Sequence, residues 1–132
     1  STLHTTDARE TVTRIIDFFP PHDQRQLRLT LAGVLRGVIC QRLVPRADGK
    51  GRCVAAEICV NTGRITEAII DPDKTQTIES LVADGAFYGM LTFDQHLIAL
   101  LRDGVITLND AISASSSPHD LQVELRRQGL VA

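Results

Sequence analysis

The chain is poor in several residue types. Its 132 residues include no tryptophan, one tyrosine and one methionine, and 4% of them are aromatic. The three cysteines, Cys40, Cys53 and Cys59, are an odd number without a C-x-x-C spacing. We interpret them as buried thiols of a reducing compartment rather than a zinc site or a disulfide framework. No apolar run approaches the roughly 20 residues that span a bilayer, and no signal peptide is recognisable. These features predict a cytoplasmic protein without membrane insertion.

An excess of one charge is also lacking. The chain carries 14 Lys and Arg residues against 16 Asp and Glu residues, a formal net charge of -2. This balance, without a basic stripe interleaved with aromatic residues, argues against nucleic acid as a partner. With 43% hydrophobic residues, the composition is that of a globular domain. The length is enough for one modest core without disulfide or metal staples.

A phosphate-binding loop is absent. Nothing in the chain matches G-x-x-x-x-G-K-[ST], since Gly49-Lys50-Gly51 lacks the first half of such a loop and its hydroxyl residue. Without this loop, no string of backbone N–H groups cradles phosphates and no lysine reaches them. No apolar strand ends in paired acids that would hold Mg²⁺. We expect that the chain alone neither binds a nucleotide tightly nor hydrolyses it.

An initiator methionine is absent as well, and the first residues are Ser1-Thr2-Leu3-His4-Thr5-Thr6. Thr2 and Leu3 resemble the end of a β-strand, so we expect a fragment of a longer protein. His4 is then placed where a side chain faces a ligand while the backbone stays fixed. Taken alone, the position is more simply explained by a histidine hydrogen-bonded at a strand-to-helix junction.

Apolar spacing predicts two helices in the first third of the chain. The first follows Thr6 and Asp7, which are good N-cap residues, and ends at Pro20-Pro21. Its apolar face contains Val12, Ile15, Ile16 and Phe19. The second is capped by Asp23, and its buried side contains Leu27, Leu31, Val34, Leu35, Val38 and Ile39.

The next stretch alternates with a period of two. Residues 40–46 and 52–60 flank Asp48-Gly49-Lys50-Gly51, which predicts a β-hairpin. In the second strand Val54, Ala56, Ile58 and Val60 form an apolar face. Glu57 lies on the opposite face, where we expect an ion pair or solvent.

From Thr62 onward the pattern predicts about five short helices. The fold class is therefore α+β, a mostly helical fragment with a β-hairpin. We expect one part over residues 1–61 and a helical subdomain over residues 62–132. Because a hairpin and a strand end leave open edges, self-association is also expected.

Five segments, in order over nearly the whole chain, resemble motifs of the type II/IV secretion ATPase superfamily. They are the histidine box at residues 1–8, Arg14-Ile15-Ile16-Asp17-Phe18-Phe19-Pro20, Leu35-Arg36-Gly37-Val38-Ile39-Cys40-Gln41-Arg42-Leu43, the strand at residues 51–58, and Tyr88-Gly89-Met90-Leu91-Thr92-Phe93-Asp94. Within the superfamily, the chain is most similar to the twitching-motility pilus retraction ATPases (PilT-type).

This resemblance implies the C-terminal part of an α/β RecA-like P-loop NTPase, with residues 1–61 in the ATPase core. The intact protein would form a homo-hexamer that uses ATP and Mg²⁺ to drive pilus disassembly. It would act at the inner face of the membrane with the platform proteins of the pilus machine. His4 would be the box histidine, near the nucleotide at a subunit boundary, and would sense the γ-phosphate.

One segment departs from the family pattern. Retraction ATPases usually carry A-I-R-N-L-I-R-E where this chain has residues 64–71, which keep Ile65, Ile69 and the terminal acid Asp71 but not the arginines. A role that depends on those charges is in doubt. Assembly-type and type II secretion members often carry a paired C-x-x-C zinc motif; its absence favours retraction over that alternative.

The remaining candidates have two explanations each. Arg25, Arg28 and Arg36 are most simply a solvated face, and the alternative is a subunit interface, because interfaces favour arginine. His22 and the other histidines share no metal-site spacing, so no metal is expected. The whole chain could also be a non-enzymatic helical oligomerisation or docking module. A function linked to a nucleotide needs His4, whereas a docking module does not.

Overall fold

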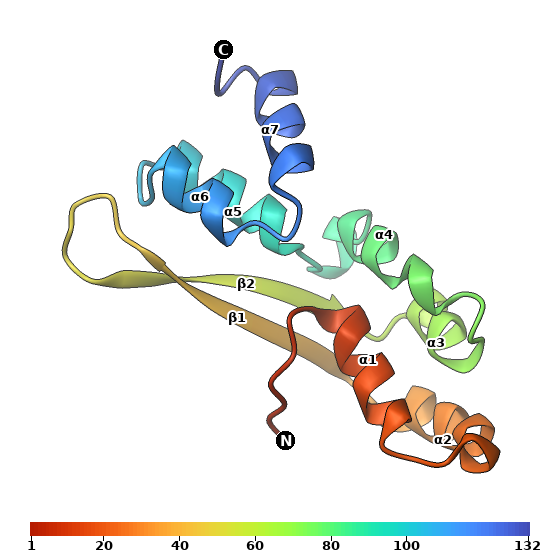
Figure 1. The fold of residues 1–132 in the computed structure, drawn as a ribbon. Coiled ribbons are helices and arrows are strands. Elements are labelled where there is room, and N and C mark those ends of the chain that lie inside the picture. Colours follow the sequence, from red (N-terminus) through yellow and green to blue (C-terminus); the bar gives the residue numbers. More distant parts are fainter. The chain divides into compact units, whose positions relative to one another are not determined.

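A computed structural model describes residues 1–132 (Figure 1). The α-helices are α1 (Ala8–Asp17), α2 (Pro21–Val34), α3 (Gly63–Ile70), α4 (Ile78–Ala83), α5 (Phe93–Arg102), α6 (Leu108–Ala114) and α7 (Pro118–Arg127). Two strands, β1 (Gly37–Pro45) and β2 (Arg52–Val60), form one hairpin, and two 3₁₀ turns are η1 (Thr75–Thr77) and η2 (Ala86–Tyr88). This order confirms the α+β class. No helix is long and apolar enough to cross a membrane.

The chain forms two compact units, and each contains one half of the hairpin. The first unit comprises residues 1–40 and 57–91, and the second comprises residues 41–56 and 92–132. These units do not follow the predicted division at residue 61, because both strands run from one unit into the other. That division stays a prediction about the longer protein.

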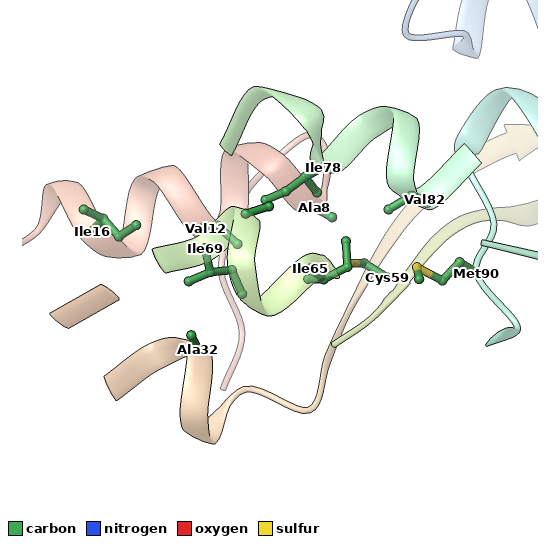
Figure 2. Close-up of a cluster of buried hydrophobic side chains, with 11 residues drawn as sticks. Ala8, Val12, Ile16, Ala32, Cys59, Ile65, Ile69, Ile78, Val82 and Met90 are labelled. Atoms are coloured by element: carbon green, nitrogen blue, oxygen red, sulfur yellow. The ribbon is translucent and has the colours of Figure 1, made fainter. Parts of the chain in front are cut away.

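The core of the first unit joins α1, α3 and α4 (Figure 2). Its apolar side chains are 5% exposed or less. They come from Ala8, Val12, Ile16, Ala32, Cys59, Ile65, Ala68, Ile69, Ile78, Val82 and Met90. The spacing of Val12 and Ile16 is the i, i+4 period of a helix with one buried face. Phe19 was expected on this face but is 44% exposed, because α1 already ends at Asp17.

Helix α2 is shorter than predicted. It begins at Pro21 without a side-chain cap, so Asp23 lies in its first turn rather than at the N-cap. It ends at Val34, where the Asn61 side-chain amide donates to the carbonyl oxygens of Ala32 (3.0 Å) and Leu35 (2.7 Å). These bonds satisfy carbonyls that the last turn of a helix leaves unpaired. Val34 is 67% exposed, contrary to prediction.

Gly37 begins β1 in place of a further helical turn. A Cβ atom at this position would lie 2.9 Å from the carbonyl oxygen of Cys59 on β2. The close approach of the two backbones therefore requires glycine. As a result, Val38 and Ile39 belong to the strand rather than to the helix, and Ile39 is 68% exposed.

The predicted apolar face of β2 is not the buried one. The structure buries Ala55, Glu57 and Cys59, whereas Val54 is 42% exposed. The register of the hairpin is set by its loop, in which Gly49 and Gly51 have positive φ angles. Because side chains alternate along a strand, this register decides the face of every residue. Small side chains and one carboxylate occupy the covered side.

The second unit packs α5, α6 and α7 around Phe93, Leu97, Ile106, Ala111, Leu121 and Leu125. Helix α5 begins with a capping box, in which the Thr92 hydroxyl accepts from the Gln95 N–H and the Gln95 side chain accepts from the Thr92 N–H. The guanidinium carbon of Arg42 lies 3.9 Å from the centre of the Phe93 ring. Arg42 also donates to the carbonyl oxygen of Ala114 at 2.6 Å.

Candidate functional site around His4

The segment that carries His4 has no regular structure over residues 1–5. The predicted strand end is therefore wrong for this chain, because a strand needs a partner for its backbone groups and the sheet contains only β1 and β2. The His4 imidazole is exposed and makes no hydrogen bond within the chain. Its backbone is fixed instead, since Arg14 Nη1 donates to the His4 carbonyl oxygen at 2.7 Å.

Arg14 is itself held on α1 by an ion pair. Its Nη2 lies 2.9 Å from Oε1 of Glu10, one helical turn earlier. The other oxygen of Glu10 accepts from the backbone N–H of Thr6 at 2.5 Å and from the Thr6 hydroxyl. These bonds from Thr6, with the charge of Arg14, lower the pKa of Glu10. The carboxylate therefore links the residues after His4 to the helix.

Asp7 and Glu57 complete the start of α1. Asp7 is the N-cap residue and accepts from the Glu10 N–H at 2.8 Å. The buried carboxylate of Glu57, on β2, accepts from the Ala8 N–H at 2.8 Å. A negative charge at a helix N-terminus is stabilised by the unpaired N–H groups there. The solvent exposure predicted for Glu57 is therefore wrong, although its predicted face is correct.

Two buried thiols lie close to this carboxylate. Burial, more than any other cause, raises the pKa of Cys59 to about 11, and the charge of Glu57 adds to the effect. Burial likewise raises the pKa of Cys40. Both thiols therefore stay protonated at neutral pH and are not nucleophiles. No group of His, Cys, Asp and Glu residues is arranged to hold a metal ion.

The arrangement can present one imidazole to a ligand from outside the chain. An exposed histidine on a backbone held by Arg14 and by the capped start of α1 can donate or accept one hydrogen bond at a fixed position. No side-chain nucleophile or base is hydrogen-bonded to it within the chain.

The predicted arginines do not share one environment. Arg25 is exposed on α2, whereas Arg28 is half-buried and donates to the carbonyl oxygen of Ile69 (2.9 Å) and to the Thr75 hydroxyl (3.0 Å). Arg36 is exposed just before β1. A solvated face therefore describes Arg25 and Arg36 but not Arg28, which ties α2 to α3.

The structure brings two of the candidate arginines close to Asp71, the terminal acid of the degenerate retraction motif. Arg25, Arg28 and Asp71 line one groove, which we call the Arg25 groove. Ile65 and Ile69 are buried in the core of the first unit, at 1% and 0% exposure, and cannot touch a partner. The lining of the groove does not include His4.

Two positioning residues escaped the sequence analysis. Arg14 and Glu57 both stand in segments that had been singled out, but their partners, the His4 carbonyl and the Ala8 N–H, are backbone groups. Residue patterns carry no signal for such bonds. The two segments that resemble family motifs, at residues 14–20 and 51–58, were the only available indication.

No family model matches the chain. Individual known proteins do match it over most of its length. Over 126 residues, 96% of this chain and 33% of the relative, it is 34% identical to the type IV pilus ATPase PilU of Pseudomonas aeruginosa. It is also 34% identical to the type IV pilus retraction ATPase PilT of that organism, over 90% of this chain and 34% of the relative.

A solved structure of the pilus retraction motor PilT with bound ADP matches 92% of the chain and 33% of that protein, with a TM-score of 0.80 and 39% identity. The chain is a homologue of the C-terminal portion of the type IV pilus retraction ATPases. It spans about a third of the length of the relatives that it matches.

Proposed function

We propose that this chain is the C-terminal portion of a hexameric ATPase that couples ATP hydrolysis to the disassembly of type IV pili. The observation that carries the proposal is the likeness to PilU and PilT over nearly the whole chain. The protein would work in the cytoplasm, at the inner membrane face, with platform proteins of the pilus machine as partners. Residues 1–61 would belong to its ATPase core and residues 62–132 to a helical subdomain.

ATP and Mg²⁺ would be held mainly by residues outside this chain. The described residues offer no phosphate loop, and His4 is the one candidate that faces outward from an anchored backbone. Bound ATP supplies the phosphoryl group that is transferred to water. In this chain, His4 would donate a hydrogen bond to that group, and loss of the bond after hydrolysis would release the segment.

The residues around His4 would pass this change to the fold. Arg14 holds the His4 carbonyl, and Glu10 connects Arg14 to Thr6. A shift of His4 would therefore move the start of α1. Glu57 opposes that shift, because it holds the Ala8 N–H from β2. These bonds support a role for the segment as a sensor rather than as the site of phosphate cleavage.

The test is ATP turnover by the chain extended through its native N-terminal part. We expect His4→Ala to lower turnover about tenfold or more, because a hydrogen bond to a charged group contributes about 1.5–3 kcal/mol. Sedimentation velocity of the same variant separates a loss of turnover from a loss of hexamers. The matched control is His22→Ala, since His22 is also exposed and its side chain is 78% accessible.

Two results would contradict the proposal. Turnover within twofold of the unmodified protein in His4→Ala would remove the histidine from the nucleotide cycle. No turnover in a well-folded extended chain would favour the docking module, which needs no histidine at this position. The Arg25 groove is the observation that favours this second function, because it is a surface suited to a partner.

A further inference from the structure

The Arg25 groove has an apolar floor between α2 and the end of α3. Its volume is about 650 Å³, within the range of sites that enclose a ligand. Leu29 and Ile70 line it and are 46% and 38% exposed. Pro21 and Pro72 add two rigid apolar side chains. Exposed apolar surface of this kind, rimmed by charge, marks an interaction site.

The charge at the groove is positive. Arg28 is held at the wall by neutral acceptors, the Ile69 carbonyl and the Thr75 hydroxyl, so its charge is not neutralised. Arg25 makes no hydrogen bond or ion pair within the chain. Asp71 offsets one of the two positive charges, and one of its oxygens already accepts from the Asp73 N–H at 2.9 Å. An occupant with one negative charge would therefore be complementary.

The same unit carries an exposed aromatic pair, Phe87 and Tyr88, which we call the aromatic knob. Phe87 is 90% exposed and Tyr88 is 57% exposed. Their rings meet edge to face, with centroids 5.0 Å apart and an interplanar angle of 88°. Because Phe87 is almost fully exposed, the knob does not fill the groove of its own chain.

Two glycines flank the aromatic knob at positions where a side chain would be strained. Gly89 has a φ angle of +80°, which favours glycine, and a Cβ atom at Gly85 would lie 2.8 Å from the Met90 side chain. The Gly85 carbonyl accepts from the N–H groups of Tyr88 (2.9 Å) and Met90 (3.0 Å). An aromatic side chain on a fixed backbone loses little conformational entropy on binding.

Asp84 lies three residues before Phe87 of the aromatic knob. Its carboxylate is exposed and has no hydrogen-bond or ion-pair partner within the chain. The residues from 84 to 88 therefore combine two aromatic rings with one negative charge. The groove offers an apolar floor with one net positive charge. The groove and Asp84 therefore carry charges of opposite sign.

We propose that the aromatic knob of one copy of the chain docks into the Arg25 groove of a second copy, with Asp84 of the first facing Arg25 of the second. The two surfaces belong to different elements, so the contact is heterologous and leaves a free knob and a free groove at the ends. Such contacts close into a ring or continue as a filament. Aromatic residues and arginine are the residue types that dominate binding at interfaces. The inference requires neither ATP nor the function proposed above.

The test is sedimentation velocity of the chain over a range of concentrations. We expect self-association that increases with concentration. Phe87→Ala and Arg25→Glu should each raise its dissociation constant about tenfold or more. The charge-exchanged double variant Arg25→Glu with Asp84→Arg should restore association. Phe18→Ala is the matched control, because Phe18 is 68% exposed and lies in neither surface. All four positions are exposed, and circular dichroism verifies folding.

Three outcomes would overturn the proposal. One is a chain that stays monomeric at all concentrations. Another is association unchanged in Phe87→Ala and Arg25→Glu, which would assign it to the open edges of the hairpin. The third is association weakened in Arg25→Glu but not recovered in the double variant.

A mixture of Arg25→Cys and Tyr88→Cys chains, once oxidised, should form mixed disulfide dimers in preference to either homodimer. Equal yields of the mixed dimer and the homodimers would also count against the contact.

Discussion

The carboxylate of Glu57 accepts a hydrogen bond from the backbone N–H of Ala8, which lies 49 positions earlier in the chain. The bond fixes the start of α1 to the middle of β2, inside the first unit. Both groups are buried, so neither can exchange its partner for water. The position of α1, and with it the backbone near His4, therefore depends on one strand carboxylate.

The first prediction concerns the loss of this carboxylate. Glu57→Ala should lower the free energy of unfolding by about 2–3 kcal/mol, because it removes a hydrogen bond to a charged acceptor and leaves the Ala8 N–H unpaired. Glu57→Gln keeps an acceptor oxygen but not the charge, and should cost about half as much. Urea denaturation followed by circular dichroism measures both values.

The control for Glu57 is a glutamate without such a role. Glu67 is exposed on α3, and Glu67→Gln should change the free energy of unfolding by less than about 0.5 kcal/mol. If Glu57→Ala were as mild as Glu67→Gln, the bond to Ala8 would contribute nothing to stability.

A second prediction concerns Arg42, which attaches β1 to the helices of the second unit. Its guanidinium lies over the Phe93 ring and donates to the Ala114 carbonyl. Arg42→Met keeps the apolar stem but loses both interactions, and should cost about 2 kcal/mol. Thermal and urea unfolding report the loss. Arg52→Met, at an exposed position on β2, should have little effect. Equal losses in the two variants would show that the contacts of Arg42 with Phe93 and Ala114 contribute nothing to stability.

The sequence was sufficient where the signals were local. Thr92 and Thr107 are the N-cap residues of α5 and α6, and each threonine accepts from an N–H three residues later. The positions of a hydroxyl and of periodic apolar residues encode such starts directly. The hairpin was also predicted correctly, because Asp48-Gly49-Lys50-Gly51 is a turn signal independent of its surroundings.

The sequence failed where the deciding partner is distant in the chain. Helix α2 ends at Val34, where the Asn61 side chain donates hydrogen bonds to the last carbonyl oxygens. No residue near Val34 in the sequence indicates this distant partner. Glu57 was expected in an ion pair or in solvent because carboxylates are rarely buried without a partner, whereas in the structure it is buried and accepts from the Ala8 N–H. His4 was singled out by its motif, yet Arg14, which fixes its backbone, acts on a carbonyl that every residue has.

A third prediction compares two glycines four residues apart. Gly37→Ala should destabilise the chain by about 1–3 kcal/mol, because the new Cβ atom would lie 2.9 Å from the Cys59 carbonyl oxygen and the hairpin backbones would have to separate. Gly33→Ala lies in α2 with nothing within 4 Å of its Cβ position, and should stabilise by about 0.5–1 kcal/mol. Chemical denaturation of both variants measures the opposite signs. If Gly37→Ala stabilised as well, the approach of β1 to β2 would be looser than described.

The last prediction concerns the pH dependence of stability above neutrality. Burial and the charge of Glu57 raise the pKa of Cys59 from an ordinary 9.0 to about 11. In the unfolded chain the thiol loses its proton above about pH 9, whereas in the folded chain it keeps the proton up to about pH 11. The unfolded state therefore binds fewer protons in this window, and the free energy of unfolding falls as the pH rises. The difference amounts to about 2 kcal/mol.

Urea denaturation at pH 8, 9, 10 and 11 measures this effect. The free energy of unfolding should fall more steeply with pH in the unmodified chain than in Cys59→Ala, which cannot titrate at this position. Equal slopes in the two chains would mean that the thiol of Cys59 reaches solvent before the chain unfolds.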